Sequence, residues 1–198
     1  MKRLLLILVL TLSFQSVAKS DDIRDFEIEG MGIGDSLLEF YSKKKIINKI
    51  NSYENKGYIY NSRDYYSLTF YDSVKFKNYD AVQFHFKDND NKYKIYSISG
   101  IKYYKSNIND CDIDMKTIEK EFDSLFLDTN KKKYTKRKHA YDKTGKSTTN
   151  DLFYNFSNKD YASITCYNWS KDINIEDQMN VSLTSDLFDN FINTKAYK

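Results

Sequence analysis

Proline is absent from this 198-residue chain, and glycine and cysteine are rare, with six and two residues respectively. This composition excludes a collagen-like chain, a coiled coil and a cysteine-rich disulfide scaffold. The aromatic content argues against disorder, because Phe, Tyr and Trp make up 16% of the residues and disordered chains are poor in such side chains. We therefore expect a folded globular protein.

Histidine is equally scarce, with two residues. His85 alternates with Phe84 and Phe86, which predicts the solvent face of a strand, and His139 lies in a basic run that should lower its pKa. The chain has no metalloprotease helix motif, serine-hydrolase elbow or zinc-type cysteine cluster. The sequence thus identifies no catalytic residue, metal ligand or cofactor site, and a paired-carboxylate site among the 28 acidic residues stays open.

Two segments carry partial ligand-binding motifs, and the sequence favours a turn for each. Residues 140–147 end in Gly-Lys-Ser but lack the first glycine of a phosphate-binding P-loop. Residues 88–91 (Asp-Asn-Asp-Asn) begin like a calcium loop, but Lys92 and Tyr93 then occupy a ligand position and the essential glycine position.

A long apolar run occurs only at the amino terminus. A basic start is followed by an apolar stretch over residues 4–14 and by Ser-Val-Ala at 16–18, which is the pattern of a signal peptide. We predict cleavage between Ala18 and Lys19. Retention as a membrane anchor is the alternative, but a helix of that length spans about 16 Å against about 30 Å of hydrocarbon.

Removal of the signal peptide 1–18 leaves residues 19–198, a length typical of a single globular domain. We expect this mature chain to have no transmembrane segment and to lie in the periplasm or outside the cell. In an oxidising compartment Cys111 and Cys166 predict one disulfide bond, with two reduced thiols or a metal site as the alternatives.

Hydrophobic periodicity predicts the α+β class, with an antiparallel sheet of aromatic-rich hairpins and short helices packed on one face. Apolar alternation predicts strands over residues 26–29, 65–71, 81–87, 93–104, 151–156, 161–169 and 178–183. Helical spacing and capping predict helices over residues 36–41, 46–50, 115–127 and 185–192. Similar hairpins, each preceded by a helix, suggest a diverged duplication with halves near 26–104 and 111–192.

Four segments carry a resemblance to small exported proteins of unknown function from AT-rich marine bacteria: residues 26–38, 95–100, 142–147 and 163–170. That resemblance implies export and no particular activity. Residues 30–37 (Gly-x-x-Ile-Gly-x-Ser-Leu) also resemble the repeat of the β-lactamase-inhibitor-like and outer-membrane-assembly-lipoprotein-like fold. The chain departs from the lipoprotein pattern because no lipid-attachment cysteine follows the signal.

A basic run is the strongest charge feature of a chain that is otherwise close to neutral. It could contact anionic lipid, cell-wall polymer or an acidic protein, and a mobile solvated loop that is dispensable for folding is the alternative. Nucleic acid is not an expected partner, because the chain is exported and nearly neutral. The six cations are Lys131, Lys132, Lys133, Lys136, Arg137 and Lys138.

These observations favour an exported, non-catalytic binding module whose partner is an envelope protein or an anionic polymer. The expected contact surface is the solvent face of a tyrosine-rich sheet with Tyr65, Tyr66, Tyr93 and Tyr96. The alternative is an envelope hydrolase whose carboxylates come together only in three dimensions.

Overall fold

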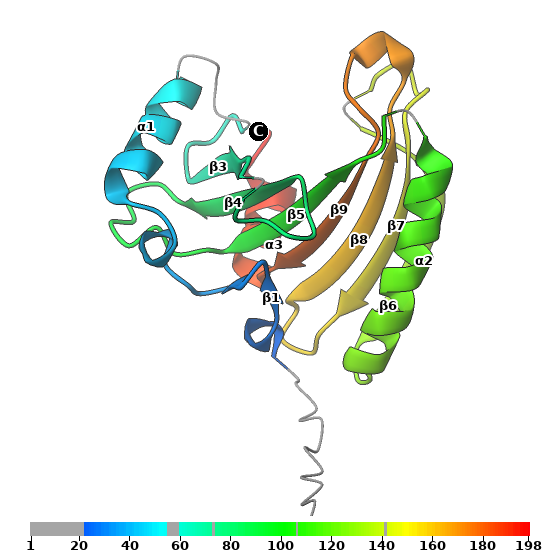
Figure 1. Ribbon diagram of the computed structural model, residues 1–198, viewed down its shortest axis with the longest axis horizontal. Coiled ribbons are helices and arrows are strands. Elements are labelled where there is room, and N and C mark those ends of the chain that lie inside the picture. Colours follow the sequence, from blue (N-terminus) through cyan, green and yellow to red (C-terminus); the bar gives the residue numbers. More distant parts are fainter. Residues whose placement is uncertain (1–21, 55–59, 73, 106, 141) are drawn as a thin grey trace, which may run out of the picture.

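A computed structural model describes residues 22–198 except 55–59, 73, 106 and 141 (Figure 1). The predicted signal peptide 1–18 and its cleavage site at Ala18 and Lys19 therefore lie outside the described residues. Within the described part of the chain, every helix is too short or too polar to cross a membrane.

Seven strands form one antiparallel sheet in the order β3-β4-β5-β9-β8-β7-β6, and β1 and β2 form a separate small ribbon. A strand is present within each of the seven predicted ranges or overlapping it, and two further strands occur: β2 in the glycine-rich segment, and β6, which covers the basic run that was expected to be a loop. The strands are β1 Glu27–Ile28, β2 Met31–Gly32, β3 Tyr65–Phe70, β4 Ala81–Lys87, β5 Ser97–Tyr103, β6 Asn130–Lys138, β7 Thr148–Asn155, β8 Tyr161–Asn168 and β9 Gln178–Thr184.

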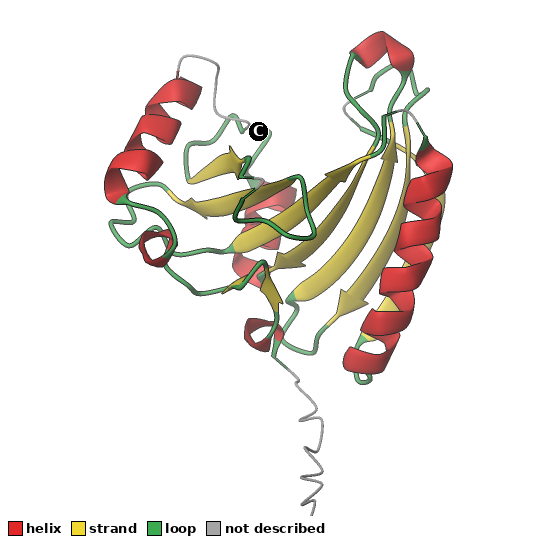
Figure 2. Ribbon diagram, in the orientation of Figure 1, coloured by secondary structure: helices red, strands yellow, loops and turns green. Residues whose placement is uncertain are grey.

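Three α-helices accompany the sheet: α1 Lys43–Glu54, α2 Ile108–Leu125 and α3 Asp186–Thr194 (Figure 2). The predicted capping box of Ser36 and Glu39 is present, but it opens a short 3-10 turn before α1 rather than the α-helix itself. Helix α2 begins earlier than residue 115. Cys111 continues the buried stripe of Met115 one turn towards the amino terminus, within a segment rich in aspartate.

The α+β class and the antiparallel sheet are confirmed, but the helices lie on both faces of the sheet rather than on one face as predicted. Helix α2 lies in front of the sheet in Figure 1, and the fainter α3 lies behind it. On α3, Phe188 and Phe191 are buried against Tyr65 and Tyr60. A second, smaller core therefore forms on the face that was expected to be open to solvent.

The main core lies between the other sheet face and the elements α1, α2 and β1–β2. Period-two alternation directs side chains such as Phe84, Leu152, Ile164 and Val181 to this face, and each is at most 2% exposed. Neighbouring strands contribute to the same layer because their Cα registers place core residues opposite one another, with Leu152 opposite Ile164 and Ile164 opposite Val181.

A disulfide bond joins Cys111 to Cys166, with their Cα atoms 6.0 Å apart, as the sequence predicted. Cys166 points to the core face of β8, also as expected. Cys111 lies inside α2 rather than before it, so the bond ties the helix directly to the sheet.

Two units with the same order of secondary-structure elements flank the central strand β9. Each consists of a helix followed by a three-stranded meander: α1-β3-β4-β5 on one side and α2-β6-β7-β8 on the other. Strands β5 and β8 both pair with β9 in antiparallel fashion. This arrangement agrees with a duplication of halves near 26–104 and 111–192, which stays a prediction.

Candidate binding site at the β6 edge

The basic run forms β6, the edge strand of the sheet, and all nine of its residues are exposed. The segment is therefore a strand and not the expected loop, and its dispensability for folding stays a prediction. Sequence periodicity did not reveal this strand because its residues are almost all polar, so neither face shows apolar alternation. Only pairing with β7, for example Lys131 with Tyr154 and Lys133 with Leu152, makes the segment extended.

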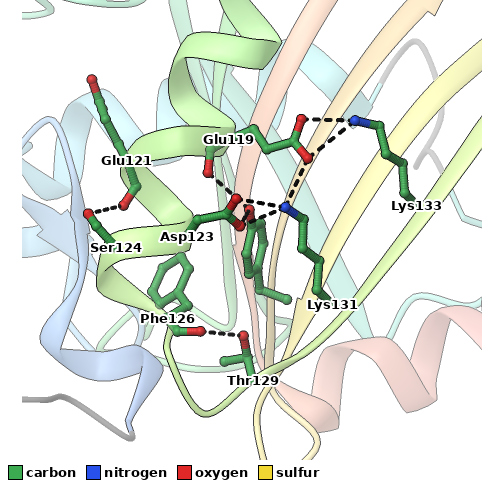
Figure 3. Close-up of polar contacts among 9 residues, drawn as sticks. Glu119, Glu121, Asp123, Ser124, Phe126, Thr129, Lys131 and Lys133 are labelled. Atoms are coloured by element: carbon green, nitrogen blue, oxygen red, sulfur yellow. Dashed lines mark hydrogen bonds and ion pairs between the residues drawn. The ribbon is translucent and has the colours of Figure 1, made fainter.

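Two lysines of β6 bind acidic residues of α2 (Figure 3). The Nζ atom of Lys131 lies 2.6 Å from Asp123 Oδ1 and 2.9 Å from Glu119 Oε1. Lys133 Nζ lies 2.9 Å from Glu119 Oε2. The buried Tyr154 donates its hydroxyl to Asp123 Oδ1 at 2.7 Å. The inner lysines thus fasten the strand to the helix.

These contacts also fix the charge of the cluster. Burial alone would raise the pKa of Glu119, but hydrogen bonds from Lys131 and Lys133 lower it. The bond from Lys131 lowers the pKa of Asp123, and Tyr154 adds to this effect. Burial works against the charge of Lys131, yet the two carboxylates raise its pKa. The positive charges of both lysines are therefore compensated by carboxylates within the molecule.

A β-bulge interrupts β6 after Tyr134. Lys136 adopts a left-handed conformation with φ of 50°, and its backbone N–H donates to Asn150 Oδ1 at 2.9 Å. Beyond the bulge, Arg137 Nη2 lies 3.1 Å from Asp151 Oδ1. The bulge re-aims the strand so that Arg137 reaches this carboxylate.

Asp151 is the buried anchor of that pair, at 1% exposure. Thr149 donates its hydroxyl to Asp151 Oδ2 at 2.7 Å, and Thr165 donates to Oδ1 at 3.2 Å. With Arg137 these bonds satisfy both carboxylate oxygens. Arg137 is thereby also compensated, although its side chain is 53% exposed.

Three cations of the basic run are not compensated by any of the ion pairs described above. Lys132, Lys136 and Lys138 are exposed, and none has an acidic partner among the residues that the structure describes. Strand alternation places Lys132 on the face of Tyr134 and Arg137, and Lys138 on the opposite face, where α2 lies. Uncompensated charge therefore borders the sheet edge on both sides.

Aromatic rings continue the face that Lys132 shares. The ring centroid of the 44% exposed Tyr134 lies 6.1 Å from that of Phe153, which in turn lies 5.6 Å from Tyr161. The guanidinium carbon of Arg137 lies 5.4 Å from the Tyr134 ring centroid. The edge thus combines positive charge with a rigid aromatic surface.

The tyrosines expected to form an open binding face are packed instead. Tyr65 is 4% exposed, beneath α3, and its ring centroid lies 5.5 Å from that of Tyr96. Tyr66 and Tyr93 both pack against Phe86, with ring centroids 5.6 Å from it. That expectation is wrong for Tyr65, which α3 covers, and the other three rings are partly buried against the two cores.

His85 was likewise expected in solvent and is 7% exposed. Its ring stacks on Phe188 with centroids 4.4 Å apart, and its Nδ1 lies 2.9 Å from the Tyr60 hydroxyl oxygen. His139 is half-buried beside Trp169, and the pKa of His139 is lowered as predicted, first by burial and also by Arg137.

Within the P-loop-like segment 140–147, the described residues 142–147 form the turn that the sequence favoured. Asp142 Oδ1 accepts hydrogen bonds from Thr144, and Asp142 Oδ2 accepts from Ser147, so the hydroxyls are already engaged. These bonds hold the pKa of Asp142 well below its usual range. Gly145, with φ of 71°, completes the turn, and strand β7 follows where a P-loop requires a helix.

The described residues contain no group of three potential metal ligands. The buried carboxylates Asp142, Asp151, Asp160 and Asp177 all accept hydrogen bonds from neighbouring donors. Burial raises the pKa of Asp189 on α3.

Comparisons with protein-family models, curated proteins and solved structures find no match for this chain. The resemblances to exported proteins of marine bacteria and to the lipoprotein-like fold stay predictions. The function is accordingly inferred from the geometry of the β6 edge.

Proposed function

We propose that the protein is exported to the periplasm or the cell exterior and acts there as a non-catalytic binding module. Its partner is anionic, either an envelope protein or a polymer, and is held at the β6 edge. The observation that carries this proposal is the uncompensated charge of Lys132, Lys136 and Lys138 on an exposed strand.

The pattern of compensation is what points to a partner. Carboxylates of α2 and β7 form ion pairs with Lys131, Lys133 and Arg137, and these pairs attach the edge strand to the rest of the fold. The described residues supply no such carboxylate to the remaining three lysines. Such a local field attracts a polyanion even though the whole chain is nearly neutral, and Tyr134 adds a rigid amphipathic contact.

Export is supported by two independent features. The amino-terminal sequence has the order of a signal peptide. The disulfide between Cys111 and Cys166 is typical of proteins from oxidising compartments.

Binding to immobilised anionic and neutral polymers tests the proposal. Polygalacturonate and an acidic protein should retain the mature chain at low salt, neutral dextran should not, and retention should fall as salt rises. The variant Lys132→Ser/Lys136→Ser/Lys138→Ser should lose this retention. Equal retention by the neutral polymer, or by the triple variant, would contradict the proposal.

A matched control removes three exposed lysines elsewhere: Lys43→Ser/Lys44→Ser/Lys120→Ser. It changes the net charge equally and should retain binding. Loss of binding in both variants would mean that total charge, rather than the β6 edge, governs the interaction.

A further inference from the structure

The distribution of charge around β6 narrows the class of partner. We propose that the β6 edge binds an extended acidic segment of a protein, which adds to the sheet as an eighth strand beside β6. This inference rests on the proposed function, because it specifies the partner of the same site.

The first support is the free edge itself. Within the described part of the chain, β6 pairs with β7 on one side and no strand lies on its other side. A strand in this position directs the N–H and C=O groups of every second residue outward. Those groups can pair with an incoming extended chain, as in other cases of strand addition to a sheet edge.

The second support is the placement of the free lysines on both sides of that edge. Lys132 faces the side of Tyr134, whereas Lys138 faces the side of α2. A ligand lying flat on either face would reach only part of this charge. A strand along the edge reaches both sets, because its own side chains alternate between the two faces.

The same features select against other occupants. A second copy of this chain would place lysines beside lysines, and like charges in directly opposite positions are destabilising. An acidic strand instead meets its complementary charge.

Synthetic peptides of about eight residues, in which pairs of glutamates alternate with pairs of threonines, test the inference because adjacent glutamates lie on opposite faces of a strand. Three forms carry the same charge: one unmodified, and two in which the backbone nitrogens of either the odd or the even residues are methylated. Strand addition uses only one of these two sets of N–H donors. We therefore expect one methylated form to lose binding at least about tenfold and the other to bind nearly as well as the unmodified peptide.

Charge reversal provides the second measurement. The affinity for the unmodified peptide should fall at least about tenfold in the variant Lys132→Glu/Lys136→Glu/Lys138→Glu. It should change less than about twofold in the control variant Lys43→Glu/Lys44→Glu/Lys120→Glu. Thermal unfolding of each variant checks that the fold is retained.

The outcomes separate this inference from the proposed function. Equal binding of all three peptides would show that charge alone holds the ligand and would overturn strand addition, leaving the anionic site intact. Binding of polygalacturonate without binding of any peptide would overturn the inference in the same way. Failure of peptides, acidic protein and polygalacturonate alike would overturn both.

Discussion

His85 shows how a single residue reports the covering of a sheet face. Helix α3 encloses the imidazole, and burial lowers the pKa of His85 to about 3. Its pKa in the unfolded chain is about 6.5. The unfolded state therefore takes up a proton between these values while the folded state does not, so stability is fully present above about pH 6.5 and declines as the pH falls.

We expect His85→Gln to reduce this dependence. Wild-type protein should lose about 2 kcal/mol more unfolding free energy than the variant between pH 7 and pH 5, measured by urea titration. His139→Gln is the control, because half-buried His139 should contribute less. A His85 ring that titrates near pH 6.5 in the folded protein by NMR would contradict its burial.

Asp123 is an acid whose contribution to stability is also lost as the pH falls. Its bond from Lys131 lowers its pKa in the folded state, so its stabilisation is present above the unfolded pKa of about 4 and is lost as the pH falls below it. Asp123→Asn should cost about 0.5 to 1 kcal/mol at pH 7, a modest value because the side chain is half-exposed.

The same variant should lose less stability than wild type between pH 5 and pH 3 in urea titrations. Glu121→Gln is the matched control on α2, since that side chain is exposed and shows no ion pair in the described structure. If both variants follow the wild-type pH curve, the ion pair with Lys131 contributes no measurable stability.

At the scale of the elements, the attachment of α2 to the sheet decides the geometry of the β6 edge. The helix is tied to β8 by Cys111 and Cys166 and to β6 by Lys131 and Lys133. The covalent link closes a loop with a sequence separation of 55 residues, which restricts the unfolded chain.

We expect Cys111→Ser/Cys166→Ser to fold but to lose about 2 to 4 kcal/mol of unfolding free energy. Urea titration of the variant and of oxidised and reduced wild type measures this loss. Reduced wild-type protein should have the same unfolding free energy as the variant. Thiols that react with a thiol reagent in the oxidised native protein would show that the bond is absent.

At the scale of the whole molecule, the fold is consistent with the proposed export. A continuous antiparallel sheet with a core on both faces gives a chain of this length enough buried surface to be stable without further disulfides. The disulfide would persist and add stability in the oxidising compartment that the proposed export implies.

We predict that the mature protein begins at Lys19. Expression of the full chain with its own amino terminus, followed by intact mass measurement of the exported fraction, should give the mass of residues 19–198. Replacement of Ala18 by a bulky residue should block processing and retain the precursor. A mass that includes residues 1–18 in the exported protein would contradict cleavage.

The sequence by itself determined the class of the fold, most of its strands and the pairing of its cysteines. Strands such as β4 and β8 were predictable because one face of each is buried, and burial imposes apolar alternation every second residue. Cys111 and Cys166 were predictable as a pair because they are the only two cysteines in the chain. The six cations of the candidate site were also named from the sequence alone.

Only the tertiary structure decided which of those cations are free and which faces are covered. Lys131 and Lys132 are neighbours in sequence, yet one binds α2 and the other faces away, because adjacent residues of a strand point to opposite sides. His85 and Tyr65 are buried by α3, which lies about a hundred residues further along the chain. Local periodicity shows that a face is polar or apolar, but the element that covers it comes from elsewhere in the sequence.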